Sequence, residues 1–330
     1  MSRYSRLTPF TPAEQRVYSI AMLNFFGPMF NAEHREALGL PETPGVVTPL
    51  SILDFLKTIG TDGTPALHLS NCICLLAKQL ELAGFLERVG GSDYYAIYSN
   101  RFELTNKQRL GTLFLGRALG LPFIADQAQR ILVHVVGTGA DDRKLGGTGI
   151  QISTTEILTC AHVVEDMQVD EVLTVNGHET RVQKTVPHPS EDVAIIYLAA
   201  PAPPPLADMA FRPARLLEDV LICGFPPIPY AAEARATYHR GEIAALSVPT
   251  CSNVKVDLFT AVARPGNSGG PLLTPEGHIV GIVTQRLEAQ VGKNEVPNAP
   301  FFAAVPAERV REAVRELSGG ETTLPWEDYQ

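Results

Sequence analysis

One serine of this chain lies in a glycine-rich loop that suits a nucleophile. Ser268 stands in the run Arg-Pro-Gly-Asn-Ser-Gly-Gly-Pro. Glycine adopts backbone conformations that other residues rarely reach, so the chain can turn tightly here and direct the amides of Gly266 and Ser268 toward one point. Two converging amides can stabilise an oxyanion. The run therefore predicts a nucleophilic serine whose oxyanion hole is formed by Gly266 and Ser268.

A base and a carboxylate that could activate this serine precede it in the chain. His162 lies in Ile-Leu-Thr-Cys-Ala-His-Val-Val, at the end of a β-like run, and Asp192 lies in His-Pro-Ser-Glu-Asp-Val-Ala-Ile-Ile. A serine hydroxyl needs a base to take its proton, and the base needs a carboxylate to fix its tautomer. A carboxylate at the start of an apolar run also needs a partner. We therefore expect a catalytic triad of His162, Asp192 and Ser268.

The order His, Asp, Ser is that of chymotrypsin-type proteases. Eight segments in sequence resemble the HtrA/Deg subgroup of these trypsin-like enzymes: GTGIQIS, ILTCAHVV, EDVAIIYL, DVLICGFPP, HRGEIAALS, RPGNSGGPLL, GHIVGIVT and FFAAVPAERV. The resemblance spans about residues 130–318 and implies an all-β, chymotrypsin-like domain of two six-stranded barrels with the triad between them. It also implies a serine endopeptidase that forms an acyl-enzyme on Ser268, with His162 as general base, Asp192 orienting it and no metal or organic cofactor.

Three departures from the family pattern bear on regulation. Cys160 stands where HtrA enzymes usually have Asn, and we interpret it as a buried packing residue. Asn267 replaces the aspartate that in digestive proteases pairs with a freed N-terminus, so the activation route is expected to differ. We expect no PDZ domain after residue 318. His188, four residues before Asp192, is interpreted as a solvated turn residue rather than a rival base.

The resemblance also implies a primary substrate pocket. By the family's offset from the nucleophile, Val262 forms its floor, followed by Ala263, and the walls come from Thr284, Gln285 and Arg286. An apolar floor cannot neutralise a buried lysine or arginine. We therefore expect cleavage after small or medium aliphatic residues such as Val, Ala or Leu, provided that Arg286 and Arg264 stay at the rim of the pocket.

The first hundred residues predict helices and a short strand. Helices are expected over 11–26, 50–59, 70–85 and 105–119, with a strand in DYYAIYS after Gly90-Gly91. Helix, turn, helix and a glycine-started strand pair resemble a winged helix over residues 12–100. From residue 130 onward β-rich runs dominate. We expect a mainly α domain at 1–125 with a regulatory or interaction role, the protease domain at 126–320 and a tail at 321–330.

Charge and cysteine usage limit the partners and the compartment. Residues 1–125 carry 11 basic against 10 acidic side chains, and the helix expected over 70–85 has Lys78 as its one basic residue. A DNA reader normally presents several cations, so a regulatory protein or ligand is favoured over DNA at this domain. The five cysteines follow no metal-ligand pattern, and no apolar run is long enough for a signal or a membrane span. We expect a cytoplasmic protein with free thiols.

Two alternatives to a working protease stay open. One is a catalytically inactive module that keeps the protease fold for binding. The other is a winged-helix DNA-binding regulator whose protease half is a sensor. Reaction with a fluorophosphonate tests the first, and retention on duplex DNA tests the second.

Overall fold

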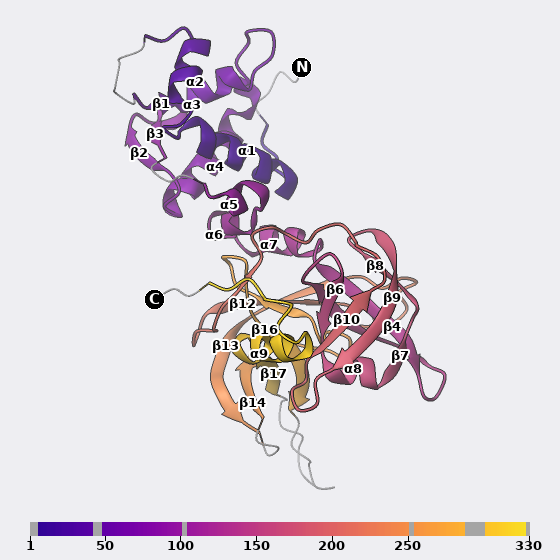
Figure 1. Cartoon of the computed structure of the whole chain (residues 1–330). Helices are drawn as coiled ribbons and strands as arrows, with labels where there is room; N and C mark the ends of the chain where they lie inside the picture. The colour runs from indigo at the N-terminus through magenta and orange to yellow at the C-terminus, as the bar shows by residue number, and fades with distance from the viewer. Residues whose placement is uncertain (1–5, 42–47, 101–103, 251–253, 288–300, 328–330) are drawn as a thin grey trace. The chain divides into compact units, whose positions relative to one another are not determined.

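The computed structural model describes residues 6–41, 48–100, 104–250, 254–287 and 301–327. The chain divides into two compact units, Met1–Pro122 and Phe123–Gln330 (Figure 1). Within the described residues, no helix has the length and apolar character needed to cross a bilayer.

The helices of the first unit begin at side-chain caps that the sequence provides. Helix α1 (Pro12–Phe25) starts after Thr11, whose hydroxyl accepts the amide of Glu14 while the Glu14 carboxylate accepts the amide of Thr11. Helix α3 (Ile52–Thr58) repeats this capping box with Ser51 and Asp54. Each box satisfies amides that the first turn leaves without helical partners.

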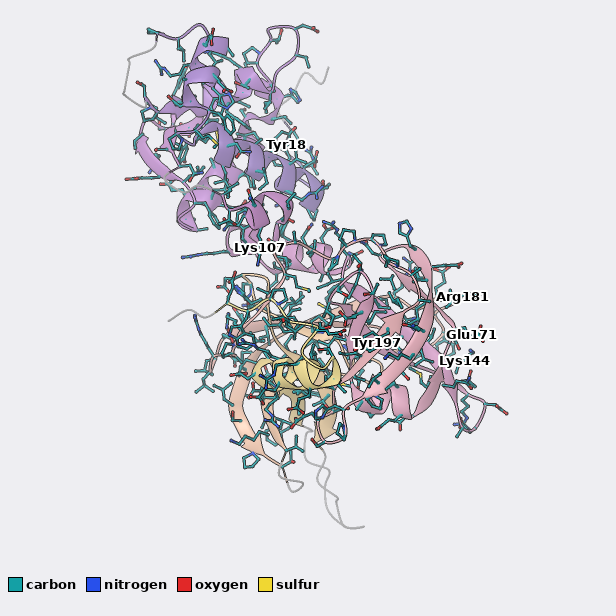
Figure 2. All side chains as sticks on the ribbon, viewed as in Figure 1. Tyr18, Lys107, Lys144, Glu171, Arg181 and Tyr197 are labelled. Atoms are coloured by element: carbon teal, nitrogen blue, oxygen red, sulfur yellow. The ribbon has the colours of Figure 1, made fainter. Side chains whose placement is uncertain are left out.

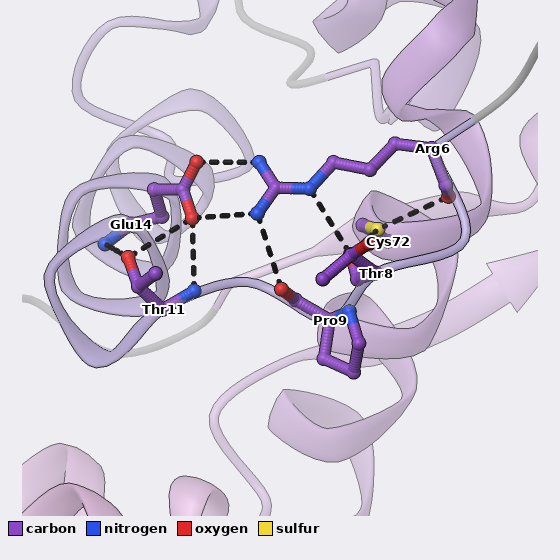
Figure 3. A network of polar contacts seen from close by, with 6 residues as sticks. All are labelled: Arg6, Thr8, Pro9, Thr11, Glu14 and Cys72. Carbon is purple, nitrogen blue, oxygen red and sulfur yellow. Dashed lines mark hydrogen bonds and ion pairs between the residues drawn. The ribbon is translucent and has the colours of Figure 1, made fainter.

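The chain before α1 is tied to the first unit by a compact polar network (Figure 3). The Arg6 guanidinium binds both carboxylate oxygens of Glu14 and the carbonyls of Thr8 and Pro9. The Cys72 thiol donates to the carbonyls of Arg6 and Thr8 from helix α4 (Ser70–Leu82). The Arg6 contacts hold the pKa of Glu14 at about 2. This network fixes one wall of an 860 Å³ groove along α4.

Three short strands complete this unit and correct two details of the prediction. Strands β1 (Leu50–Ser51), β3 (Ile97–Ser99) and β2 (Glu87–Gly90) form an antiparallel sheet in the order β1-β3-β2. The run Asp93–Tyr95, expected as strand, is a 3₁₀ helix. The helix expected over 105–119 is broken into α5 (Asn106–Leu110), a 3₁₀ turn and α6 (Gly116–Leu119), because α5 ends at Gly111 in an extended conformation.

Helix α4 buries only part of its apolar surface. Ile73, Leu76 and Leu80 are fully enclosed, whereas Leu75 is 65% exposed and Leu82 is 79% exposed. Helix α2 (Asn31–Ala37) lies between α1 and β1 in the chain.

Helix α7 (Leu121–Ala128) contains the boundary between the units in the chain, and the second unit continues into a seven-stranded antiparallel sheet. Its order is β7-β4-β5-β6-β10-β9-β8, with bounds β4 Leu132–Gly139, β5 Lys144–Gln151, β6 Glu156–Thr159, β7 Met167–Val169, β8 Val172–Val175, β9 His178–Pro187 and β10 Ala194–Leu198. Strands β4 and β8 lie close together, so the sheet curls on itself. On its outer side, Lys184 of β9 lies 4.6 Å from the ring of Tyr197 in β10, which is labelled in Figure 2.

A second seven-stranded sheet closes into a barrel. Its order is β11-β16-β15-β12-β13-β14-β17, and β16 also pairs with β17, so six strands form a closed ring to which β11 is added. The bounds are β11 Ala210–Phe211, β12 Asp219–Gly224, β13 Thr237–Pro249, β14 Lys255–Phe259, β15 Pro271–Leu273, β16 His278–Leu287 and β17 Phe301–Pro306. An apolar cluster that includes Ile222, Phe259 and Val283 fills this barrel. The second unit is therefore the barrel-containing β domain that the sequence predicts.

The chain then forms helix α9 (Ala307–Leu317), which buries Val310 and Val314 as their four-residue spacing predicts. Cys72, Cys74, Cys160 and Cys223 have free thiols, and all but Cys74 are buried. The fifth, Cys251, lies outside the described residues.

Candidate active site

His162 and Asp192 come together at the first sheet. His162 lies in the first turn of helix α8 (Ala161–Glu165), directly after β6, and Asp192 lies just before β10, the strand paired with β6. The imidazole Nδ1 lies 2.9 and 2.8 Å from the two carboxylate oxygens. The backbone amide of His162 donates to Asp192 Oδ1 at 3.0 Å.

The protonation of this pair follows from its contacts. Burial alone would raise the pKa of Asp192, but hydrogen bonds from the His162 ring and backbone and from Thr284 outweigh it and hold the pKa at about 2. An ionised carboxylate only accepts hydrogen bonds, so His162 Nδ1 carries the proton and Nε2 is left as the free base. Burial lowers the pKa of His162, and the hydrogen bond and charge of Asp192 more than reverse this, so the net pKa is raised.

The hydroxyl of Thr284 contacts the same carboxylate, and the Cys160 thiol lies near it. The Thr284 hydroxyl, from β16, donates to Asp192 Oδ2. The Cys160 thiol is fully buried two residues before His162 and donates to the carbonyl of Val283 at 3.2 Å. Asp192 is thus held by groups from both sheets.

The loop that carries Ser268 has an alternating pattern of hydrogen bonding. The amides of Asn267, Gly269 and Gly270 donate to backbone carbonyls. The amides of Gly266 and Ser268 have no acceptor among the described residues. Gly266 has φ +93°, and a Cβ there would lie 2.6 Å from the carbonyl oxygen of Phe225. The loop therefore leaves two alternate amides available to a ligand.

Thr148 of β5 ties this loop to the first sheet. Its amide donates to the carbonyl of Ser268 at 2.8 Å, and its hydroxyl donates to the carbonyl of Gly266 at 2.6 Å. The backbone of Gly269 packs on the segment before His162, since a Cβ at Gly269 would lie 3.1 Å from the amide nitrogen of Cys160. Ser268 is therefore fixed beside the His162 segment. Within the described residues no hydrogen bond links the Ser268 hydroxyl to His162, a contact that is often long without substrate.

By the sequence resemblance, Asn267 replaces the aspartate that pairs with a freed N-terminus in digestive proteases. Its side chain is fully buried, and neither amide atom has a hydrogen-bond partner in the described part of the chain. An ionised carboxylate in this enclosed position would need a cation. The neutral amide avoids that requirement.

Residues 147–282 match the family model described as "Trypsin-like peptidase domain". The matched range lies within the second unit. The matched range includes Thr148, His162, Asp192 and Ser268.

Two of the known proteins that are similar to this chain are named serine proteases. "Serine protease Rv3671c" of Mycobacterium tuberculosis is 35% identical over 148 residues, which is 42% of this chain and 36% of that protein. "Serine protease HtrA-like" of Staphylococcus aureus is 26% identical over 199 residues, covering 55% of this chain and 23% of that protein. The chain thus matches about a third or less of the length of these relatives.

Solved structures of serine proteases match this chain at low TM-scores and low sequence identity. The active form of the M. tuberculosis Rv3671c protease has a TM-score of 0.46 at 24% identity, covering 61% of this chain and 86% of that chain. The HtrA-type protease AlgW with a tripeptide has a TM-score of 0.47 at 21% identity, covering 60% of this chain and 62% of that chain.

The pocket residues expected from the sequence are spread over different environments. Val262 is 47% exposed, and Ala263 packs against the apolar cluster of the closed barrel. Thr284 is buried and donates to Asp192. The side chains of Gln285 and Arg286 lie outside the described residues. The structure therefore gives Thr284 a contact with the His162–Asp192 pair that the pocket prediction did not include.

The second unit also groups three potential metal ligands. One ligand atom each of Cys160, His162 and Asp192 lies within 4.8 Å of the others. Burial raises the pKa of the Cys160 thiol well above its usual value, so the sulfur keeps its proton, and His162 Nδ1 is already bonded to Asp192. These ligand atoms are therefore engaged or protonated, which disfavours a cation.

The interpretation of His188 as a solvated turn residue is wrong. His188 is 7% exposed, and its ring bonds to Glu316 of α9 and to two backbone amides. The two prolines around it suggested an exposed loop, but α9 covers this turn. The sequence does not predict the role of Thr148, because its partners in the serine loop, Gly266 and Ser268, lie 118 or more residues away and nothing local marks it.

Proposed function

We propose that this chain is a serine endopeptidase that hydrolyses peptide bonds of protein substrates, with His162, Asp192 and Ser268 as its triad. The observation that carries the proposal is the ionised Asp192 bonded to His162 Nδ1, close to a loop in which alternate amides are free. The family match and the names of the relatives support the same reaction.

The reaction would follow from these positions. Ser268 Oγ attacks the substrate carbonyl while His162 Nε2 takes the hydroxyl proton, and the Asp192 carboxylate stabilises the imidazolium. The carbonyl oxygen becomes an oxyanion that accepts from the amides of Gly266 and Ser268. Collapse breaks the peptide bond as His162 returns the proton to the leaving amine. Water then attacks the acyl-enzyme by the same route and releases the acid.

The proposed substrate preference is an aliphatic residue before the cleaved bond. Its support is that Val262 and Ala263 are apolar and that Ala263 packs on an apolar core. Arg264, one candidate for turning into the pocket, lies with its guanidinium 3.4 Å from His239 Nε2 instead. A peptide library would test this preference, and dominant cleavage after Lys, Arg, Asp or Glu would exclude it.

For the first unit, we propose a winged-helix-like fold with a regulatory or protein-binding role. The element order α1, α2, β1, α3, α4, β2, β3 and the β1-β3-β2 sheet support the fold. Lys78 is the single basic residue of α4, and exposed Leu75 and Leu82 lie on the same helix, which favours an apolar partner over DNA. Titration of the full chain with duplex DNA would show tight, salt-dependent binding if this preference is mistaken.

Activity-based labelling tests the main proposal. The wild type should react covalently with a fluorophosphonate and hydrolyse a denatured protein substrate. The Ser268→Ala variant should lose labelling and retain at most about 10⁻⁴ of the rate, with an unchanged melting temperature. A folded wild-type protein that neither labels nor hydrolyses would instead favour the inactive binding module.

A further inference from the structure

The turn that leads into Asp192 is organised by a buried histidine. His188 Nδ1 accepts the amides of Ser190 at 3.3 Å and Glu191 at 3.0 Å. A nitrogen that accepts two N–H groups carries no proton, so the proton is on Nε2, which donates to Glu316 of α9 at 3.0 Å. The ring thereby does what an Asn or Asp side chain does in a turn, accepting amides two and three residues ahead.

The residue adjacent to Asp192 is fixed by a second contact with the same helix. Glu191 is 7% exposed, and its Oε1 forms an ion pair with Arg309 of α9. Its other oxygen, Oε2, is buried and has no partner among the described residues. A buried carboxylate is unfavourable unless a cation accompanies it, so the ion pair with Arg309 stabilises Glu191 in this turn.

The turn is closed on itself and continues directly into the active site. The amide of His188 donates to the carbonyl of Val193, and the amide of Val193 donates to the carbonyl of Glu191, both at 2.8 Å. Asp192 lies inside this closed turn. Any relaxation of the turn therefore moves the carboxylate that holds His162.

We propose that His188, Glu191 and Arg309 are positioning residues for Asp192, and that α9 is thereby a structural part of the catalytic apparatus. The inference rests on the proposed protease function. A displacement of a catalytic group by about 1 Å can lower a rate by about a hundredfold, so a small loosening of the turn is enough to matter.

Substitutions at His188 give the direct test. His188→Leu removes the acceptor of both amides, whereas His188→Asn restores an acceptor of the kind that turns commonly use. We expect His188→Leu to lower kcat/KM by about tenfold or more, mainly through kcat, and His188→Asn to recover most of the loss. Because Asp192 raises the pKa of His162, His188→Leu should also shift the acidic limb of the pH–rate profile to lower pH.

Two exposed arginines of α9 form a matched pair of variants. Arg309→Met removes the partner of Glu191, whereas Arg315→Met removes the same charge from the same helix at a residue with no ion pair among the described residues. We expect Arg309→Met to lower kcat/KM and to shift the acidic limb of the pH–rate profile in the same direction as His188→Leu, but less. Arg315→Met should match the wild type in both. The comparison of these two arginine variants still tests the proposal if His188→Leu does not fold.

An NMR titration of the His162 imidazole, assigned with His162→Gln, tests the positioning of Asp192 separately from the proposed protease function. It needs no turnover and should show a lower midpoint in His188→Leu and Arg309→Met than in the wild type. Wild-type midpoints and rates in both folded variants would overturn the inference and leave the protease proposal intact. Absence of Ser268-dependent labelling in the wild type would instead refute the protease proposal, while the titration still tests the positioning of Asp192.

Discussion

Replacement of Gly266 by alanine tests the proposed oxyanion hole. At φ +93° an L-residue is strained by about 1–2 kcal/mol, and the new Cβ would lie 2.6 Å from the carbonyl oxygen of Phe225. The Gly266 peptide must shift to relieve this contact, and its amide then leaves the position from which it could meet an oxyanion. Loss of one such donor lowers kcat by about 10²–10³-fold, or about 3–4 kcal/mol of transition-state stabilisation.

Gly177 supplies the control for backbone strain. It has φ +80° with nothing within 4 Å of an added Cβ, in the hairpin between β8 and β9. Both Gly266→Ala and Gly177→Ala should lower the melting temperature by a few degrees, but only Gly266→Ala should lose hydrolysis of a peptide substrate. A Gly266→Ala enzyme with wild-type kcat would refute the assignment of this amide to the oxyanion.

Three further outcomes follow from the titrating groups. Asp192→Asn should lower kcat by about 10⁴-fold and lower the pKa of His162, as read by imidazole NMR, because the acceptor and charge are lost while burial remains. Thr284→Val should lower kcat/KM by about tenfold in steady-state assays. Valine has nearly the shape of threonine but no hydroxyl, so Asp192 loses a hydrogen-bond donor. Burial raises the pKa of Asp257 from 3.8 to about 6, so its ionisation opposes folding as pH rises through this window. Urea unfolding should therefore show Asp257→Asn gaining up to about 2–3 kcal/mol on the wild type between pH 4 and pH 7, and an equal difference at both pH values would contradict this.

The candidate site was predictable where its signal is local. Ser268 and Gly266 occur in one short loop, and His162 and Asp192 each lie at the end of a β-rich run, so residue type and order suffice to nominate them. Thr148, Thr284 and Arg309 act on that site through partners about 90 to 120 residues away. No spacing in the sequence reports such contacts, because they depend on how the two sheets and α9 pack.

The helices and strands were likewise predictable only where their sequence signal is local and strong. Capping residues and apolar spacing predicted α1, α3, α4 and α9. Strand β9, rich in polar and charged residues, gave no strand signal because its faces are largely solvated. The break between α5 and α6 depended on Gly111, which the apolar pattern of the segment obscures.

The contacts of Thr148 have a consequence for the order in which the parts of the site become available during synthesis. Its partners Gly266 and Ser268 are made more than a hundred residues later, and the Arg309 that fixes the turn before Asp192 is later still. Ribosomes add roughly 5–20 residues per second, and N-terminal domains fold first. A nascent chain therefore completes its first unit and its first sheet well before the serine loop has emerged. Premature release upstream of that loop yields fragments that lack Ser268, so such fragments could not carry out the proposed hydrolysis of neighbouring proteins.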